Sequence, residues 1–405
     1  MRKKGEIFRR EKTKTRLFLL IVCVLAWIPG RISEAKTNED VLIHITMNEA
    51  RRMAQETAEE WAQAVEPDKN LSVDNVQDVL TGDGSWEFIV SYAKGKKPYG
   101  YASVVVDENG AVVKKSVLDS GKETPVEEIQ ETMQEQGETY GEEVSEEEAV
   151  IALDDLHYAA AYEEEDGEIV YVDEDGQTYT SADLYGSKKY KDGHDIYIPK
   201  RNWKDSKYKV KNKTKKVLTK FVGRTELVTQ KKVINSTNKY ACSIQSLMQI
   251  AYMERLIGSY TPKNIKNFYE DMWGVIAKSK KGERGVLYGD TWLEKAAKGF
   301  IRYAVDAGYK KTEFKGVKKN PDIDWIRNKI EYNRPILFGY HLNLNGKKKG
   351  HMISVLGVMK AKKVSSGNTW NYIMVYNAWD DEVQFINYDC VDFMDSIATY
   401  FWVKK

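Results

Sequence analysis

The strongest constraint on the fold is a change of hydrophobic period within the second half of this 405-residue chain. Up to about residue 331, apolar residues recur every three or four positions, and beyond residue 334 they form short runs typical of strands. Helices are expected at 242–258, 261–273, 291–308 and from 320 onward, and strands at 334–340, 350–362, 368–379, 382–389 and 398–404. Helices followed by an antiparallel sheet predict an α+β fold with a helical layer and a sheet layer.

The region before residue 120 carries a separate pattern of one helix and several strands. Thr46 and Glu49 form a T-x-x-E capping box, which predicts a helix over 46–65. Alternating runs follow it, and the turn "DENG" joins two of them as a hairpin. We therefore expect a small α/β domain, one helix on an antiparallel sheet, over residues 36–120.

The first 35 residues have the three regions of a secretory signal. Eight Lys/Arg precede Leu17, twelve apolar residues run to Ile28, and the small-residue pattern Ser33-Glu34-Ala35 follows. Twelve residues are too few to span a bilayer easily, so cleavage after Ala35 is preferred to a retained anchor. Secretion is expected, with attachment to the cell surface as an alternative, and no stable membrane association once the signal is removed.

Two blocks of opposite charge make residues 121–215 a predicted connector. Residues 121–175 hold 21 Asp/Glu and one Lys, whereas residues 186–220 hold 13 Lys/Arg and three Asp. Such blocks are solvated linkers or an electrostatic clasp between domains. A helix is expected near 145–160, and the lysine-rich stretch 200–220 suits proteolytic cleavage. Since the basic block lacks interleaved aromatic residues, nucleic acid is not expected as a partner.

Cys242 lies where an apolar helical stripe begins. Unpaired backbone N–H groups and positive potential at a helix N-terminus favour a thiolate and can bind an oxyanion. The position suits a nucleophile, although a buried packing role or a disulfide with Cys390 would also fit one cysteine here.

A nucleophilic thiol needs a base, and His351 opens a strand after the turn "NGKKKG". His341 is the alternative, in a run where strand packing also explains it. Asn377 ends a later strand, so its amide could accept from the His351 ring and orient it. Trp379 could shield that bond from water. Asp380 and Asp381 are rival acceptors, otherwise ordinary acidic turn residues.

Together, "YACSIQ", "NRPILFGY", "GHMISVLGV" and "YNAWD" resemble the papain-like cysteine peptidase superfamily, in particular secreted bacterial members of the streptopain-like and bacteriocin-leader-peptidase-related groups. The resemblance covers residues 216–405. It implies a papain-like catalytic domain with Cys242, His351 and Asn377 as nucleophile, base and orienter. The chemistry calls for neither a metal ion nor a cofactor.

The residues around the cysteine depart from the pattern of that superfamily. Ser236 stands where a glutamine often supplies an oxyanion donor. Asn235 and Asn238 are the candidates to replace it, with Gln230 or the Cys242 backbone N–H as further options. Residues 36–120 also resemble an inhibitory propeptide, which implies a zymogen in which the N-terminal domain blocks the site.

Three functions remain open from the sequence. The first is a secreted peptidase acting on peptides or proteins through a Cys-His-Asn triad. The second is a cell-wall amidase of the same superfamily, and the third is a catalytically inactive surface or binding protein on that fold.

Overall fold

The computed structural model describes residues 41–403 with internal gaps. The gaps are 83–84, 136–149, 164–167, 175, 181–183, 185–195, 216–237, 240, 255, 257–261, 277–279, 282–286, 289–290, 310–312, 315, 345–346 and 378–382. The predicted signal peptide therefore lies outside the described residues. In the part of the chain that is described, no helix is long and apolar enough to cross a membrane.

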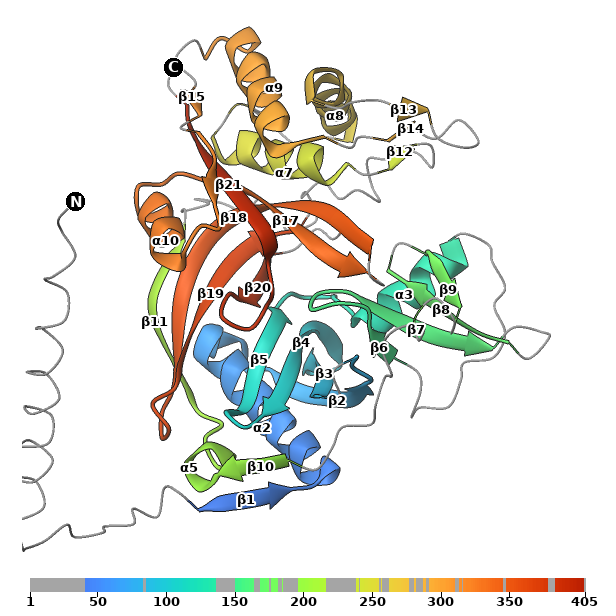
Figure 1. The fold of residues 1–405 in the computed structure, drawn as a ribbon, viewed down its shortest axis with the longest axis vertical. Coiled ribbons are helices and arrows are strands. Elements are labelled where there is room, and N and C mark those ends of the chain that lie inside the picture. Colours follow the sequence, from blue (N-terminus) through green and yellow to red (C-terminus); the bar gives the residue numbers. More distant parts are fainter. Residues whose placement is uncertain are drawn as a thin grey trace, which may run out of the picture. The chain divides into compact units, whose positions relative to one another are not determined.

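Strands, not a layer of helices, dominate the molecule. They take 45% of the described residues and helices take 31%. The predicted α+β fold of a helical layer on a sheet is therefore wrong. The physical reason is that strands from both halves of the chain join in one 12-stranded antiparallel sheet, with helices against both of its faces (Figure 1).

Ten strands of this sheet follow one another by hydrogen bonding, and two more pair off this path. In spatial order the ten are β15 (Glu313–Phe314), β21 (Met394–Trp402), β17 (Ile336–Leu344), β18 (Lys347–Lys363), β19 (Thr369–Tyr376), β20 (Val383–Asn387), β5 (Gly110–Val117), β4 (Lys97–Asp107), β3 (Trp86–Lys94) and β2 (Ser72–Val79). The other two are β11 (Tyr208–Lys215), which pairs with β18, and β16 (Lys318–Lys319), which pairs with β21.

The remaining strands form small sheets. These are β1 (Leu42–Ile45) with β10 (Ile196–Pro199); β6 (Val150–Ala152), β7 (Tyr158–Glu163), β8 (Ile169–Asp173) and β9 (Thr178–Thr180); and β12 (Asn238–Lys239), β14 (Leu287–Tyr288) and β13 (Lys280–Lys281). Strands β6 and β7 occupy part of the range where a helix near 145–160 was predicted, so that prediction is wrong for residues 150–160.

Seven α-helices are described. They are α2 (Met47–Val65), α3 (Pro125–Glu135), α5 (Lys200–Trp203), α7 (Cys242–Met253), α8 (Pro262–Ile276), α9 (Leu293–Asp306) and α10 (Ile323–Glu331), and a 3-10 turn spans Pro67–Lys69. The capping box of Thr46 and Glu49 is present at the start of α2. The helix starts that the sequence pattern predicted near residues 46, 242, 262, 291 and 320 are therefore confirmed to within three residues.

Three apolar clusters meet along the long strand β18. Met359 and Ala361 face α2 and its buried Trp61. Ile353, Val355 and Val358 pack with residues of α10, and Met352 packs with residues of α7 and α9. The strand thus links both halves of the molecule.

Strands β5 and β20 join the region before residue 120 to the C-terminal region. Gln384, Phe385 and Ile386 pair with Val117, Ser116 and Lys115. The Tyr372 hydroxyl also donates to the buried carbonyl of Val113 at 2.7 Å. The described residues from 41 onward belong to one compact unit. The predicted boundaries at 120 and 215 stay a prediction.

A buried lysine near the end of β18 gives a test of this packing. Lys363 is 2% exposed, donates to the Thr57 hydroxyl at 3.2 Å and lies 4.4 Å from the centroid of the Tyr208 ring. Burial lowers its pKa to about 7, against the opposing charges of Asp205 and Glu60. At acidic pH the folded protein therefore buries a cation, which is costly.

Lys363→Met is expected to raise the free energy of unfolding by about 2 kcal/mol near pH 6. Between pH 7 and 10.5 the folded lysine is neutral while the unfolded one stays protonated, so the wild-type protein gains stability as pH rises. The advantage of the variant should therefore shrink toward pH 10. Urea unfolding of both proteins across this pH range measures the difference between their free energies of unfolding. A difference that stays constant with pH would contradict the lowered pKa of Lys363.

Candidate functional site

Cys242 is the first residue of α7, as the sequence pattern predicted. Its side chain is half-buried and is not joined to Cys390 in a disulfide. Ala241 is the N-cap, and its carbonyl accepts from the backbone N–H groups of Ile244 and Gln245 at 2.9 and 3.0 Å. The sulfur thus lies at the positive end of a twelve-residue helix, which favours its thiolate form.

Helix α7 buries several polar side chains. Burying polar groups costs free energy unless they form hydrogen bonds, so packing alone does not explain these residues. Ser246, one turn after Cys242, donates from its hydroxyl to the backbone carbonyl of Met352 at 2.9 Å. This bond fixes the first turns of α7 against β18 at the residue next to His351. Gln245 is fully buried, and neither atom of its amide has a partner among the described residues. The sequence pattern had marked neither residue.

His351 is buried in β18, with 4% of its surface exposed. Its Nε2 lies 2.8 Å from the backbone carbonyl oxygen of Asn377. Since a carbonyl oxygen can only accept, Nε2 carries a hydrogen, and in a neutral ring Nδ1 is then the basic atom. The acceptor is thus the main chain of Asn377, whereas the sequence pattern suggested its side-chain amide.

The surroundings of His351 hold its ring neutral. Burial lowers the pKa of His351 to about 3, and the charge of His157 acts in the same direction, against the Asn377 carbonyl and Asp154. At neutral pH the ring is therefore an imidazole, not an imidazolium. A thiolate–imidazolium pair requires the opposite state, so the described arrangement is not that of an ionised Cys-His pair.

Tyr340 packs against the ring of His351. It lies directly across from His351 on β17, and the two rings meet edge to face with centroids 5.6 Å apart. Burial raises the pKa of Tyr340 well above its ordinary value, and the charges of Asp154 and Cys242 raise it further. His351 and Tyr340 thus lie on one side of the sheet, whereas Cys242 packs in the apolar cluster of α7, α8 and α9. Met352, unlike His351, packs with residues of α7, because successive side chains of a strand alternate in direction.

Residues 153–157, which link β6 and β7, lie on the Tyr340 side of the sheet, where Leu156 packs in the same apolar cluster as Tyr340; we call them the cover segment. The Asp154 carboxylate accepts from the backbone N–H groups of Leu156 and His157 and lies 2.8 Å from Nδ1 of His157. Although burial opposes the change, Asp154 holds the pKa of His157 above its ordinary value. The cover segment thus carries a buried charge pair that acts on both His351 and Tyr340.

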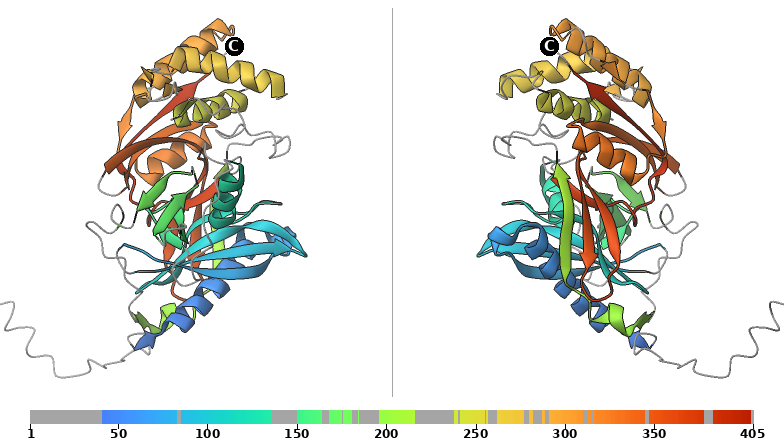
Figure 2. Two further views of the ribbon diagram at one scale, coloured as in Figure 1. Left: turned by 90° about the vertical axis from the view of Figure 1, so that its right-hand side faces the viewer. Right: turned by 90° about the vertical axis from the view of Figure 1, so that its left-hand side faces the viewer.

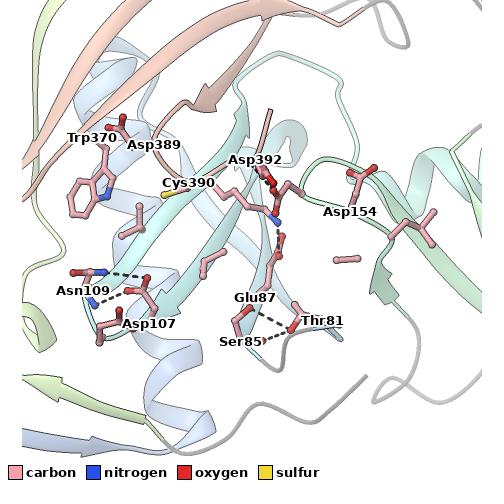
Figure 3. Close-up of a pocket in the computed structure, with 18 of the residues that line it drawn as sticks. Thr81, Ser85, Glu87, Asp107, Asn109, Asp154, Trp370, Asp389, Cys390 and Asp392 are labelled. Atoms are coloured by element: carbon pink, nitrogen blue, oxygen red, sulfur yellow. Dashed lines mark hydrogen bonds and ion pairs between the residues drawn. The ribbon is translucent and has the colours of Figure 1, made fainter. Parts of the chain in front are cut away.

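A cavity of about 680 Å³ lies at the cover segment (Figure 3). Asp154 and Asp155 line it, together with Glu87, Lys114 and Trp370. Other lining residues are Thr81, Gly82, Ser85, Val105, Asp107, Glu108, Asn109, Val112, Ala152, Leu153, Asp389, Cys390, Asp392 and Met394. Cys242, His351 and Asn377 are not among the lining residues of this cavity.

The other predicted site residues have varied positions. His341 is 34% exposed, and its Nδ1 lies 3.6 Å from the carboxylate of Asp395. Asn238 begins β12, where its backbone pairs in parallel with Leu287. Asn235 and Trp379, together with Ser236, Gln230, Asp380 and Asp381, lie outside the described residues. The oxyanion and shielding roles stay predictions. Over the described part of the chain, no three His, Cys, Asp or Glu side chains are placed to hold a metal ion.

Comparison with known proteins gives little guidance. No family model matches the chain, and no curated protein matches it. Four chains of solved structures match, among them the active wild-type interpain A cysteine protease of Prevotella intermedia. That likeness has 14% identity and a TM-score of 0.24, and covers 35% of this chain and 58% of the other. The match thus spans less than two thirds of that protease, and at this TM-score it supports no argument about fold or activity.

Proposed function

We propose that this chain is a cysteine peptidase with Cys242 as nucleophile, His351 as base and Asn377 as the residue that orients the base. The main support is the bond from Nε2 of His351 to the Asn377 carbonyl, which leaves Nδ1 as the basic atom. A second support is the position of Cys242 at the start of α7, which the Ser246 bond holds against β18.

In the proposed reaction, Nδ1 of His351 takes the proton of the Cys242 thiol, and the thiolate attacks the carbonyl carbon of a peptide bond. The backbone N–H groups at the start of α7 can stabilise the resulting oxyanion, with Asn235 or Asn238 as further donors. His351 then gives its proton to the leaving amine, and a thioester to Cys242 remains. Water hydrolyses the thioester and restores both residues.

The proposed enzyme is made as a latent form. His351 is buried and neutral, and the cover segment adds the charge of His157 beside it. Movement of that segment would admit water to the ring and allow it to become an imidazolium. The region before the lysine-rich stretch 200–220 would thus inhibit the catalytic residues that lie later in the same chain. Export through the N-terminal signal, with peptides or proteins as substrates, completes the proposal.

Selective alkylation tests the proposed nucleophile. Cys390 is an internal control: its side chain is exposed to the reagent, yet desolvation of the thiol together with Asp107 and Asp389 raises its pKa to about 12. In a chain from residue 36 to 405 that is cleaved in the stretch 200–220, iodoacetamide should modify Cys242 at least about tenfold faster than Cys390 at neutral pH. His351→Ala should remove most of this difference, and peptide mass mapping gives both rates.

The uncleaved chain should show slower modification of Cys242, because its His351 is neutral. If Cys242 stays unreactive after cleavage while the protein remains folded, the result would favour a catalytically inactive binding protein over a peptidase. Digestion of peptidoglycan without digestion of casein would instead favour the cell-wall amidase.

A further inference from the structure

Two pairs of lysines face each other across β11 and β18; we call these four residues the lysine ladder. Lys209 lies directly opposite Lys362, and Lys211 lies directly opposite Lys360. Lys209 and Lys211 are exposed, and Lys360 and Lys362 are partly exposed. Within the described residues, no carboxylate forms an ion pair with any of the four. Like charges placed directly opposite in a sheet are destabilising, so the arrangement costs stability in the isolated chain.

Protection of a sheet edge explains the two lysines on β11 but not the two on β18. In the described part of the chain, β11 pairs with β18 alone, so it is an edge strand, and lysines commonly block such edges. Figures 1 and 2 show β11 running along the outer side of the sheet. However, β18 is paired on both sides in this region, with β11 and β19. Edge protection therefore gives no reason for Lys360 and Lys362 to face the lysines of β11.

The residues around the lysine ladder leave it positively charged. On β19, the residues opposite Lys360 and Lys362 are Asn371 and Thr369, which carry no charge. Arg327 of α10 donates to the side chain of Asn371 at 3.3 Å and pairs with Asp324. The carboxylate of Asp389 accepts from the side chain of Asn371. The excess charge is thus available to an anionic partner.

We propose that the lysine ladder and the edge of β11 bind an extended, Glu- or Asp-rich segment of a partner protein. Alternate residues on a strand are about 6.6 Å apart, so Lys209 and Lys211 match the spacing of alternate side chains in an extended peptide. Such a peptide can add to the unpaired edge of β11 through backbone hydrogen bonds while its carboxylates reach the ladder. Both features of the site are then used.

The chemistry of the surface favours a peptide over nucleic acid. Binding of single-stranded nucleic acid uses aromatic rings on which bases stack. The neighbouring aromatic residue on β19, Trp370, packs with the α2 cluster on the opposite face of the sheet. A phosphate polymer could meet the ammonium groups but has no backbone N–H groups to pair with the edge of β11. The lysine ladder would bind its partner whether or not Cys242 is catalytic.

Fluorescence anisotropy with a labelled Glu-rich peptide, at low ionic strength, tests the proposal on the full chain. Lys360→Gln with Lys362→Gln should weaken binding about tenfold, as the loss of two ion pairs implies. The matched control is Lys318→Gln with Lys319→Gln, which removes two exposed charges from β16. The control should change the affinity less than about twofold. Lys209→Gln with Lys211→Gln, on the edge strand, is a second variant should the first not fold.

A second peptide distinguishes backbone pairing at the edge of β11 from charge attraction by the lysine ladder. The same peptide, N-methylated at alternate residues, keeps its carboxylates but loses backbone donors and should bind more weakly to the native chain. Equal weakening by the ladder and control variants would contradict the proposal, since general charge would then explain binding. Equal binding of the methylated peptide would also overturn it. If inorganic polyphosphate bound with the same lysine dependence and the peptide did not, the surface would be a phosphate site instead.

Discussion

Cys242→Ala is expected to lower kcat/KM for peptide hydrolysis at least about a thousandfold in the cleaved protein. The substitution removes the sulfur that would form the covalent intermediate and leaves only the backbone donors at the start of α7. His351→Ala should cause a loss of similar size, because the thiol then lacks its base. The double variant should be little worse than either single one, since residues that act as one unit are not additive.

The control for this prediction is Cys390→Ala, which should leave kcat/KM unchanged. The Cys390 thiol has a pKa raised to about 12, so it is a poor nucleophile at neutral pH. Initial rates with a fluorogenic peptide compare the native protein with all four variants. Hydrolysis that survives Cys242→Ala at the native rate would exclude this cysteine as the nucleophile.

Local sequence signals predicted the start of the helices and one hairpin well. The capping box placed the start of α2, and the Asn-Gly pair placed the turn between β4 and β5, where Gly110 has a φ of 88°. A side chain at Gly110 would also meet the carbonyl oxygen of Asn202 at 2.8 Å. The capping box and the turn depend on neighbouring residues alone, so a short stretch of sequence is sufficient to specify them, whereas the approach of Asn202 to Gly110 depends on the fold.

The shared sheet could not be predicted in the same way. Val117 of β5 pairs with Gln384 of β20, more than 250 positions later in the chain. Nothing in either strand alone identifies its partner, because alternating apolar residues suit any neighbouring strand. The predicted fold class was wrong for this reason: strands were expected in both regions, but each region was given its own sheet.

The candidate site shows the same limit. The types of Cys242, His351 and Asn377 and their positions beside predicted elements were sufficient to select them. The influence of Asp154 and His157 on His351 depends on how β6 and β7 pack, which no local pattern reports. His157 in particular had no signal beyond its residue type, since the surrounding residues were expected to form a helix.

Lys114→Met is expected to lower the free energy of unfolding by about 3–5 kcal/mol. Lys114 and Glu87 are 4% and 3% exposed, and the Lys114 ammonium donates to Glu87 at 2.6 Å. Although burial opposes it, Glu87 holds the pKa of Lys114 above its ordinary value, so the lysine stays charged at neutral pH. Removing the lysine would leave a buried carboxylate without its cation.

The Glu87 carboxylate also accepts from the hydroxyls of Ser103 and Tyr158 at 2.6 and 2.7 Å. Tyr158 begins β7, directly after the cover segment. Its bond to the Glu87 carboxylate therefore ties β7 to the 12-stranded sheet. The double variant Glu87→Met with Lys114→Met should be less destabilised than Lys114→Met alone, because it leaves no unpaired buried charge. Urea unfolding followed by tryptophan fluorescence compares them. If the single and double variants unfold at the same urea concentration, the lysine does not stabilise the fold through this carboxylate, and β7 must be held by its apolar contacts.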